Sequence, residues 1–216
     1  MMINMTTTTS TTNSSTDNIL NIDDHYIRYP KDAWGGTDLN NPDMINPWIE
    51  MQEIINPKKV IEIGMWAGHA SLVMMTVFKN LQSLVSYDIS KVSRDNARQI
   101  KKYWPQHTFY QEPIWGNEHR HTSIDLIFVD GFHLKDGPLK DLDSCMKIKP
   151  RYIVMDNLEM DAVRQAARNR WSLYDVKYEP KYYFYSNTKW SSQNKYMMHS
   201  PGVMGLFKME GHYDNM

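Results

Sequence analysis

The residues best suited to chemistry are acidic side chains that stand at the ends of short apolar runs. Glu62, Asp88, Glu112, Asp130 and Asp156 each close or follow such a run. A carboxylate in this position can bind ribose hydroxyls, hold a hard cation or help to move a proton. One strand-terminal acid is as often a helix cap or a turn residue. Five in succession indicate a shared functional edge.

The runs that carry these acids alternate with segments of helical pattern. Strand-like runs cover residues 60–63, 84–87, 108–111, 124–129 and 152–155. Helix-like segments cover residues 47–55, 70–78, 91–103, 135–147 and 158–169. Strict alternation favours right-handed βαβ units and a parallel sheet with helices on both faces. Ligands bind such sheets at the carboxyl ends of the strands, where the acids stand.

The C-terminal part of the chain breaks this alternation. Strand-like stretches at 175–179, 182–186 and 203–209 are separated by polar loops rather than by helices, which indicates antiparallel pairing. The sequence therefore predicts a doubly wound, Rossmann-like α/β fold. Its sheet is expected to have seven mostly parallel strands and an antiparallel C-terminal edge.

The N-terminal part has little to bury. Residues 5–16 are a polar run rich in threonine and serine, and residues 24–46 combine aromatic and turn-forming residues without helical spacing. We expect a poorly ordered tail over residues 1–23 and one domain over residues 24–216. Within that domain, residues 24–46 are a candidate lid.

The composition restricts the partners. With 24 Lys and Arg against 25 Asp and Glu, the chain has no global positive field, which disfavours a nucleic-acid partner. Its one cysteine, Cys145, cannot form an intramolecular disulfide and indicates a reducing compartment. We find no long apolar stretch and no secretory pattern, so we expect a cytoplasmic protein without a membrane partner.

Two glycines lie between the first predicted strand and its helix. Gly64 and Gly68 allow positive φ and let a ligand approach the backbone N–H groups of the turn. Their spacing differs from the Gly-x-Gly-x-x-Gly of nicotinamide-binding enzymes, which disfavours an oxidoreductase. Asp88, at the end of the next strand, is suited to accept both hydroxyls of a ribose.

The order of these motifs resembles the class I S-adenosylmethionine-dependent methyltransferases. The resemblance covers roughly residues 42–209 and is greatest to O-methyltransferases of the catechol and caffeoyl-coenzyme A type. It implies methyl transfer from S-adenosylmethionine to an oxygen of a small hydroxylated molecule. The motifs that carry it are Glu62-x-Gly64-x-x-x-Gly68, Tyr87-Asp88, Asp130-Gly-Phe-His133 and Asp156-Asn157.

The resemblance also implies a cofactor site. The methionine part of the cofactor would lie against Glu62 and the two glycines, the ribose against Asp88 and the adenine against Ile89. Relatives commonly use a serine where this chain has Ala70, so the neighbouring Ser71 is the candidate for the cofactor carboxylate. The implied cofactor-binding residues are Glu62, Gly64, Gly68, Ser71, Asp88, Ile89 and Asp130.

Asp130, Asp156 and Asn157 match the positions that hold a divalent cation in metal-dependent relatives. Their oxygen donors suit Mg²⁺, Mn²⁺ or Ca²⁺, which would lower the pKa of the acceptor hydroxyl. In the other interpretation, Asp130 contacts only the cofactor and Asp156 caps a helix. His133 takes the place of the lysine that serves these relatives as base, so the expected catalytic residues are His133 and Asp130, with Lys135 in reserve.

Other functions remain open. An RNA or protein methyltransferase is one alternative, although the chain lacks the Asp/Asn-Pro-Pro-Tyr turn of amino-methylating DNA enzymes. A non-catalytic cofactor-binding module is another. The last strands could offer a free sheet edge for a homodimer.

Overall fold

The computed structural model describes residues 42–173, 182–185 and 203–209. Its strands are β1 (Lys59–Ile63), β2 (Ser83–Tyr87), β3 (His107–Tyr110), β4 (Leu126–Val129), β5 (Tyr152–Met155), β6 (Tyr182–Tyr185) and β7 (Val203–Lys208). Its helices are α1 (Pro42–Ile55), α2 (His69–Val77), α3 (Lys91–Tyr103), α4 (Gly137–Ile148) and α5 (Asp161–Leu173), with a short 3₁₀ helix, η2 (Glu118–Arg120).

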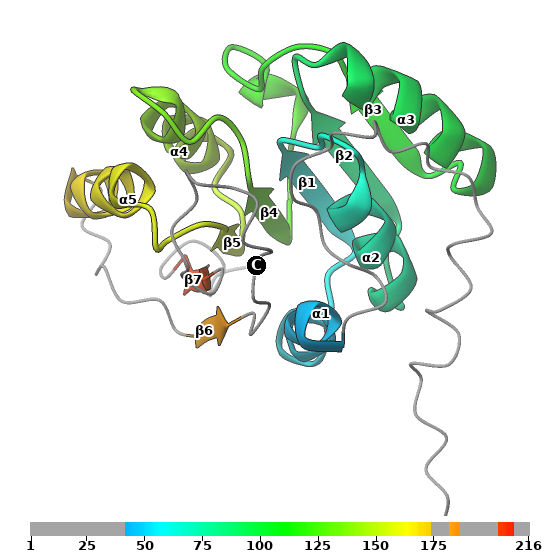
Figure 1. Ribbon diagram of the computed structural model, residues 1–216, viewed down its shortest axis with the longest axis horizontal. Helices are drawn as coiled ribbons and strands as arrows, with labels where there is room; N and C mark the ends of the chain where they lie inside the picture. Colours follow the sequence, from blue (N-terminus) through cyan, green and yellow to red (C-terminus); the bar gives the residue numbers. More distant parts are fainter. Residues whose placement is uncertain (1–41, 174–181, 186–202, 210–216) are drawn as a thin grey trace, which may run out of the picture.

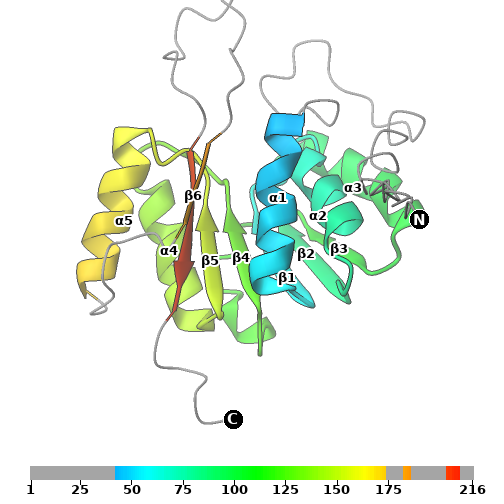
Figure 2. The ribbon, with the colours of Figure 1, turned by 90° about the horizontal axis from the view of Figure 1, so that it is seen from below.

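One sheet runs in the order β3-β2-β1-β4-β5-β7-β6. Figure 2 shows the part from β3 to β5. Strands β1 to β5 are parallel to one another, and β7 is antiparallel to both β5 and β6. The strand order reverses between β1 and β4, so the carboxyl ends of these two strands flank the expected ligand crevice. The predicted doubly wound α/β fold with an antiparallel C-terminal edge is confirmed.

Helices cover both faces of the sheet, with α1, α2 and α3 on one face and α4 and α5 on the other (Figure 1). The two faces bury different residues of β1: Val60 packs on the α1–α3 side, and Ile61 and Ile63 pack on the α4–α5 side. This alternation turns Glu62 toward α2. Trp48 of α1 packs edge-on against Phe128 of β4, with ring centroids 4.9 Å apart.

The first helix corrects one prediction. Residues 42–46 were expected to be irregular, as part of the candidate lid, but they are the first turns of α1. Proline is well tolerated at the start of a helix, and Ile45, Trp48 and Met51 recur at helical spacing and are all buried. Burial of this stripe outweighs the turn signals of the prolines. The predicted tail, residues 24–41 of the lid and the strand at 175–179 lie outside the described residues.

Smaller differences concern element ends. Helix α5 begins at Asp161 rather than at 158, β4 begins at Leu126 rather than at 124, and η2 was not predicted. Cys145 is free and buried. In the part of the chain that the structure describes, no helix is long and apolar enough to cross a membrane.

Candidate active site

The loop between β1 and α2 depends on its two glycines. Gly64 has φ +87°, and a Cβ atom there would lie 1.9 Å from the backbone oxygen of Asp130. Gly68 is the N-cap of α2, also at φ +87°, with its Cα facing the side chains of Ile100 and Met65. L-residues rarely adopt this backbone conformation, so glycine is required at both positions. The first glycine brings the ends of β1 and β4 into contact.

Asp88 holds the same loop from the end of β2. Its Oδ2 accepts hydrogen bonds from the backbone N–H groups of Met65 (2.9 Å) and Trp66 (2.7 Å), and its Oδ1 accepts one from Ser90 (2.7 Å). Each carboxylate oxygen has two lone pairs, so Oδ1 can accept a further hydrogen bond from a ribose hydroxyl. The structure thus gives this residue a bracing contact that the sequence did not predict. The next residue, Ile89, is 72% exposed and available to a ligand.

Glu62 is fully buried and receives two short hydrogen bonds. The hydroxyls of Ser71 and Ser86 both donate to its Oε2, each at 2.5 Å. Burial raises the pKa of Glu62 to about 7, although the two serine hydrogen bonds lower it. Ser71 is itself buried and its hydroxyl donates to Glu62, and its contact with the cofactor carboxylate stays a prediction.

Asp130 and His133 lie next to each other after β4 and form an ion pair when the imidazole is protonated. His133 Nε2 lies 3.1 Å from Asp130 Oδ1, and the side chains are 27% and 32% exposed. Burial raises the pKa of Asp130, and the contact with His133 offsets part of that rise. Burial alone would lower the pKa of His133, but Asp130 outweighs it, so the pKa is raised. The two predicted catalytic residues therefore lie side by side, but the His133 Nε2 contact with Asp130 does not have the geometry of a hydrogen bond.

Asp156 and Asn157 follow β5 beside this pair. The Asn157 backbone N–H donates to Asp156 Oδ1 at 2.8 Å, and Asn157 Nδ2 donates to Glu159 at 3.2 Å. Burial raises the pKa of Asp156, and the negative charge of Asp130 adds to the rise. Since like charges repel, a cation bound between the two aspartates would be stabilised.

The residues that could hold a cation here are Asp130, Asp156 and Asn157, because two carboxylates and an amide oxygen would suit a hard cation such as Mg²⁺. Among the described residues, no group of three His, Cys, Asp or Glu side chains could hold a metal ion. The metal prediction therefore depends on the asparagine as third ligand.

One buried acid near the site was not singled out from the sequence. Asp141 of α4 is 4% exposed and accepts a 2.8 Å hydrogen bond from Trp115 Nε1. A Cβ atom at Gly131 would lie 2.5 Å from its Oδ2, so this carboxyl packs beneath the turn that follows Asp130. Burial raises the pKa of Asp141 to about 6. No sequence signal separates it from Asp143 of the same helix.

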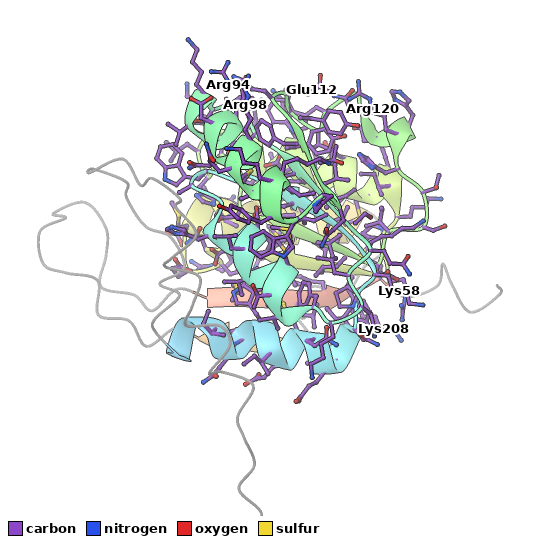
Figure 3. The ribbon with its side chains drawn as sticks, turned by 90° about the vertical axis from the view of Figure 1, so that its right-hand side faces the viewer. Lys58, Arg94, Arg98, Glu112, Arg120 and Lys208 are labelled. Carbon is purple, nitrogen blue, oxygen red and sulfur yellow. The ribbon has the colours of Figure 1, made fainter. Side chains whose placement is uncertain are left out.

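Glu112, another strand-terminal acid, is engaged elsewhere. It pairs with Arg120 of η2 at 2.5 Å, and the Arg120 guanidinium lies 5.1 Å from the ring centre of Tyr110. Figure 3 shows Glu112 and Arg120 beside each other, on the side of the molecule away from α1. Glu112 therefore stabilises the loop after β3 through its contact with Arg120, rather than lying beside Asp130.

Exposed apolar side chains belong to the loops that carry these acids. Trp66, Ile89, Phe132 and Leu134 stand on the loops after β1, β2 and β4, and each has more than two fifths of its surface exposed. Large apolar side chains are more often buried, and an exposed group of them beside polar residues is typical of a ligand site.

Residues 61–155 match the family model described as a methyltransferase domain. The fold is shared with solved methyltransferase structures. The matched segment runs from β1 to β5 and contains every predicted site residue except Asp156 and Asn157, which follow it directly. The resemblance carried by the motifs is confirmed.

Solved methyltransferase structures share this fold. The O-methyltransferase of Bacillus cereus in complex with S-adenosylhomocysteine (SAH) has a TM-score of 0.58 and 15% identity, over 91% of both chains. TomG of Streptomyces achromogenes, an O-methyltransferase in complex with SAM, has a TM-score of 0.56 and 14% identity, over 78% of this chain and 80% of its own. The SAH-bound methyltransferase PaMTH1 of Podospora anserina has a TM-score of 0.53 and 15% identity, over 81% of this chain and 85% of its own. No curated protein sequence matches the chain.

Proposed function

We propose that this methyltransferase transfers the methyl group of S-adenosylmethionine to an oxygen of a small hydroxylated molecule. The observation that carries the proposal is the meeting of the Gly64 turn with Asp130 and His133 at the carboxyl edge of the sheet. The turn and Asp88 supply a cofactor cradle, and the ion pair supplies a candidate base beside it. SAM- and SAH-bound O-methyltransferases with this fold support the assignment.

In the reaction, the acceptor hydroxyl loses its proton, its oxygen bonds to the methyl carbon and the carbon–sulfur bond breaks. The electron pair of that bond stays on sulfur, which gives S-adenosylhomocysteine. Because Nε2 of His133 faces Asp130, Nδ1 is the nitrogen left to take the acceptor proton. Asp130 keeps the imidazole oriented and stabilises its charged form, as carboxylates do in other histidine-based sites. The protein otherwise contributes alignment of the two reactants and exclusion of water.

A divalent cation is part of the proposal. Asp130, Asp156 and Asn157 would hold it, with Mg²⁺, Mn²⁺ or Ca²⁺ as the fitting ions. When bound, the cation would lower the pKa of the acceptor hydroxyl.

The experiment is a methyl-transfer assay with labelled S-adenosylmethionine and catechol as the acceptor probe. His133→Ala should lower turnover by about 10²–10⁴-fold, because it removes a positioned base, and should leave SAH affinity nearly unchanged. His119→Ala, at an exposed histidine of η2, is the matched control and should retain full turnover. If the His133 variant retains full turnover, the role of base is wrong. Labelling of RNA or protein without labelling of catechol or any other small hydroxylated compound would refute the acceptor class.

A further inference from the structure

A chain of buried hydrogen bonds crosses three neighbouring strands, from β1 to the edge strand β3. Ser86 Oγ lies 2.5 Å from Glu62 Oε2 and 2.9 Å from His107 Nε2. All three side chains are 0% exposed. The mechanism above uses neither Ser86 nor His107. Burying three polar groups costs free energy unless each is hydrogen-bonded, so the presence of this hydrogen-bond chain in the core needs an explanation.

The direction of each hydrogen bond follows from the number of protons. A serine hydroxyl has one hydrogen, and Ser86 donates it to Glu62. His107 Nε2 must then be the donor to Ser86, so the neutral imidazole carries its proton on Nε2. The Oε2 atom of Glu62 is saturated by Ser71 and Ser86, whereas its Oε1 has no hydrogen-bond partner among the described residues. A proton or a neighbouring cation would therefore act on Oε1.

We propose that Ser86 and His107 are positioning residues of the cofactor site. They hold Glu62 in place through its Oε2 atom, so that the bound cofactor acts on the protonation state of Glu62 at Oε1. Binding of the cationic amino group of the cofactor would then be coupled to the loss of a proton from Glu62. The inference rests on the proposed function, because it takes the cofactor to bind beside the Gly64 turn. It adds two residues, on β2 and β3, that act through Glu62.

The charges around the hydrogen-bond chain agree with a coupling between cofactor binding and proton loss from Glu62. Burial raises the pKa of Glu62 to about 7 despite the hydrogen bonds from the two serines, and the carboxylates of Asp130 and Asp88 make a smaller contribution to this rise. Glu62 is therefore partly protonated at neutral pH, and a nearby cation would favour its charged form. Burial lowers the pKa of His107 to about 4, and the Lys101 ammonium, which donates to the His107 backbone oxygen at 2.5 Å, also lowers it. His107 thus stays neutral and donates through Nε2.

The test is calorimetric titration of S-adenosylhomocysteine from pH 6 to pH 8, in two buffers with different heats of ionisation. The wild-type protein should release part of a proton near pH 7 and should bind more tightly as the pH rises. Ser86→Ala removes a hydrogen bond that favours the charged carboxylate, so it should weaken binding at pH 7 by about tenfold and move the pH midpoint upward. His107→Leu should act in the same direction. His107→Gln, which keeps an N–H donor, should restore the wild-type profile.

Ser144→Ala is the matched control. Ser144 is also a buried serine that donates to a glutamate, Glu118, at 2.8 Å, but it lies on α4. This variant should lower the melting temperature without moving the pH profile of SAH binding. If Ser86→Ala does not fold, Ser86→Cys keeps a weak donor and should show a smaller upward shift.

Two results would overturn different claims. If the Ser86 and His107 variants keep the wild-type affinity and proton release, they serve packing alone and the positioning role is wrong. If the wild-type protein binds no SAH at any pH, the proposed function itself is wrong.

Discussion

Replacing Gly64 by alanine tests the contact that joins β1 to β4. The new Cβ atom would lie 1.9 Å from the backbone oxygen of Asp130, 2.5 Å from its carbonyl carbon and 2.8 Å from the Cα of Gly131. These are backbone atoms, so the clash cannot be relieved by a side-chain rotation. A left-handed alanine costs about 1–2 kcal/mol, and overpacking adds about 1–3 kcal/mol. We expect the free energy of unfolding to fall by about 2–5 kcal/mol.

Gly116→Ala is the control, because Gly116 has φ +84° and a Cβ atom added there would have no neighbour within 4 Å. It carries the backbone cost without the clash. At about 2–4 °C per kcal/mol for a chain of this size, Gly116→Ala should lower the melting temperature by roughly 2–8 °C and Gly64→Ala by roughly 4–20 °C. Gly64→Ala should also abolish SAH binding, whereas Gly116→Ala should not. Equal melting temperatures and equal SAH affinities in the two variants would refute the close approach of the two loops.

Three further predictions use the buried titratable groups. Burial raises the pKa of Glu62 from 4.5 to about 7, so its contribution to the stability of the folded protein is complete below pH 4.5 and is lost as the pH rises through 7. Glu62→Gln should therefore gain stability relative to wild type between pH 5 and pH 8, by up to about 3 kcal/mol in urea unfolding. Burial lowers the pKa of His107 from 6.5 to about 4, so its contribution to the stability of the folded protein is complete above pH 6.5 and is lost as the pH falls through 4. His107→Gln should therefore reduce the loss of stability at acid pH in the same urea-unfolding measurements. Trp115→Phe leaves Asp141 without its hydrogen bond and should cost about 1–3 kcal/mol at pH 8 but less at pH 5, where a carboxyl with a pKa of about 6 is protonated.

Much of the fold could be predicted from local patterns. Runs such as 60–63 and 152–155 are short, β-branched or apolar, and ended by glycine or an acid, so both the strands and their alternation with helices were evident. Because the carboxyl ends of parallel strands meet at one edge, the sequence also predicted that the strand-terminal acids share this edge, but the contact of Asp130 with the Gly64 turn depends on the pairing of β1 with β4.

The parts that sequence reasoning missed depend on contacts between distant residues. Ser86 contacts Glu62, and His107 contacts Ser86, only when β1, β2 and β3 pair, and a serine in a strand pattern gives no signal of that contact. Ser71 was assigned to the cofactor from its position in the loop, and its hydrogen bond to Glu62 was not predicted. The start of α1 was missed because prolines signal breaks, whereas burial of Trp48 and its neighbours stabilises the helix.

The role of the proposed cation can be tested with one substitution. Asp156→Ala should abolish any stimulation of catechol methylation by Mg²⁺ and leave SAH affinity nearly intact, because Asp156 is proposed to bind the cation and not the cofactor. Turnover that is stimulated by Mg²⁺ to the same extent in this variant and in the wild type would show that the ion does not act through Asp156.

The most direct measurement of the central claim is calorimetric titration of S-adenosylhomocysteine into the purified protein, once with Mg²⁺ and once with a chelator. We predict a dissociation constant in the micromolar range or below, and a catechol titration that follows only in the presence of Mg²⁺. Failure to bind S-adenosylhomocysteine in both buffers would contradict the cofactor assignment and leave only the α/β fold.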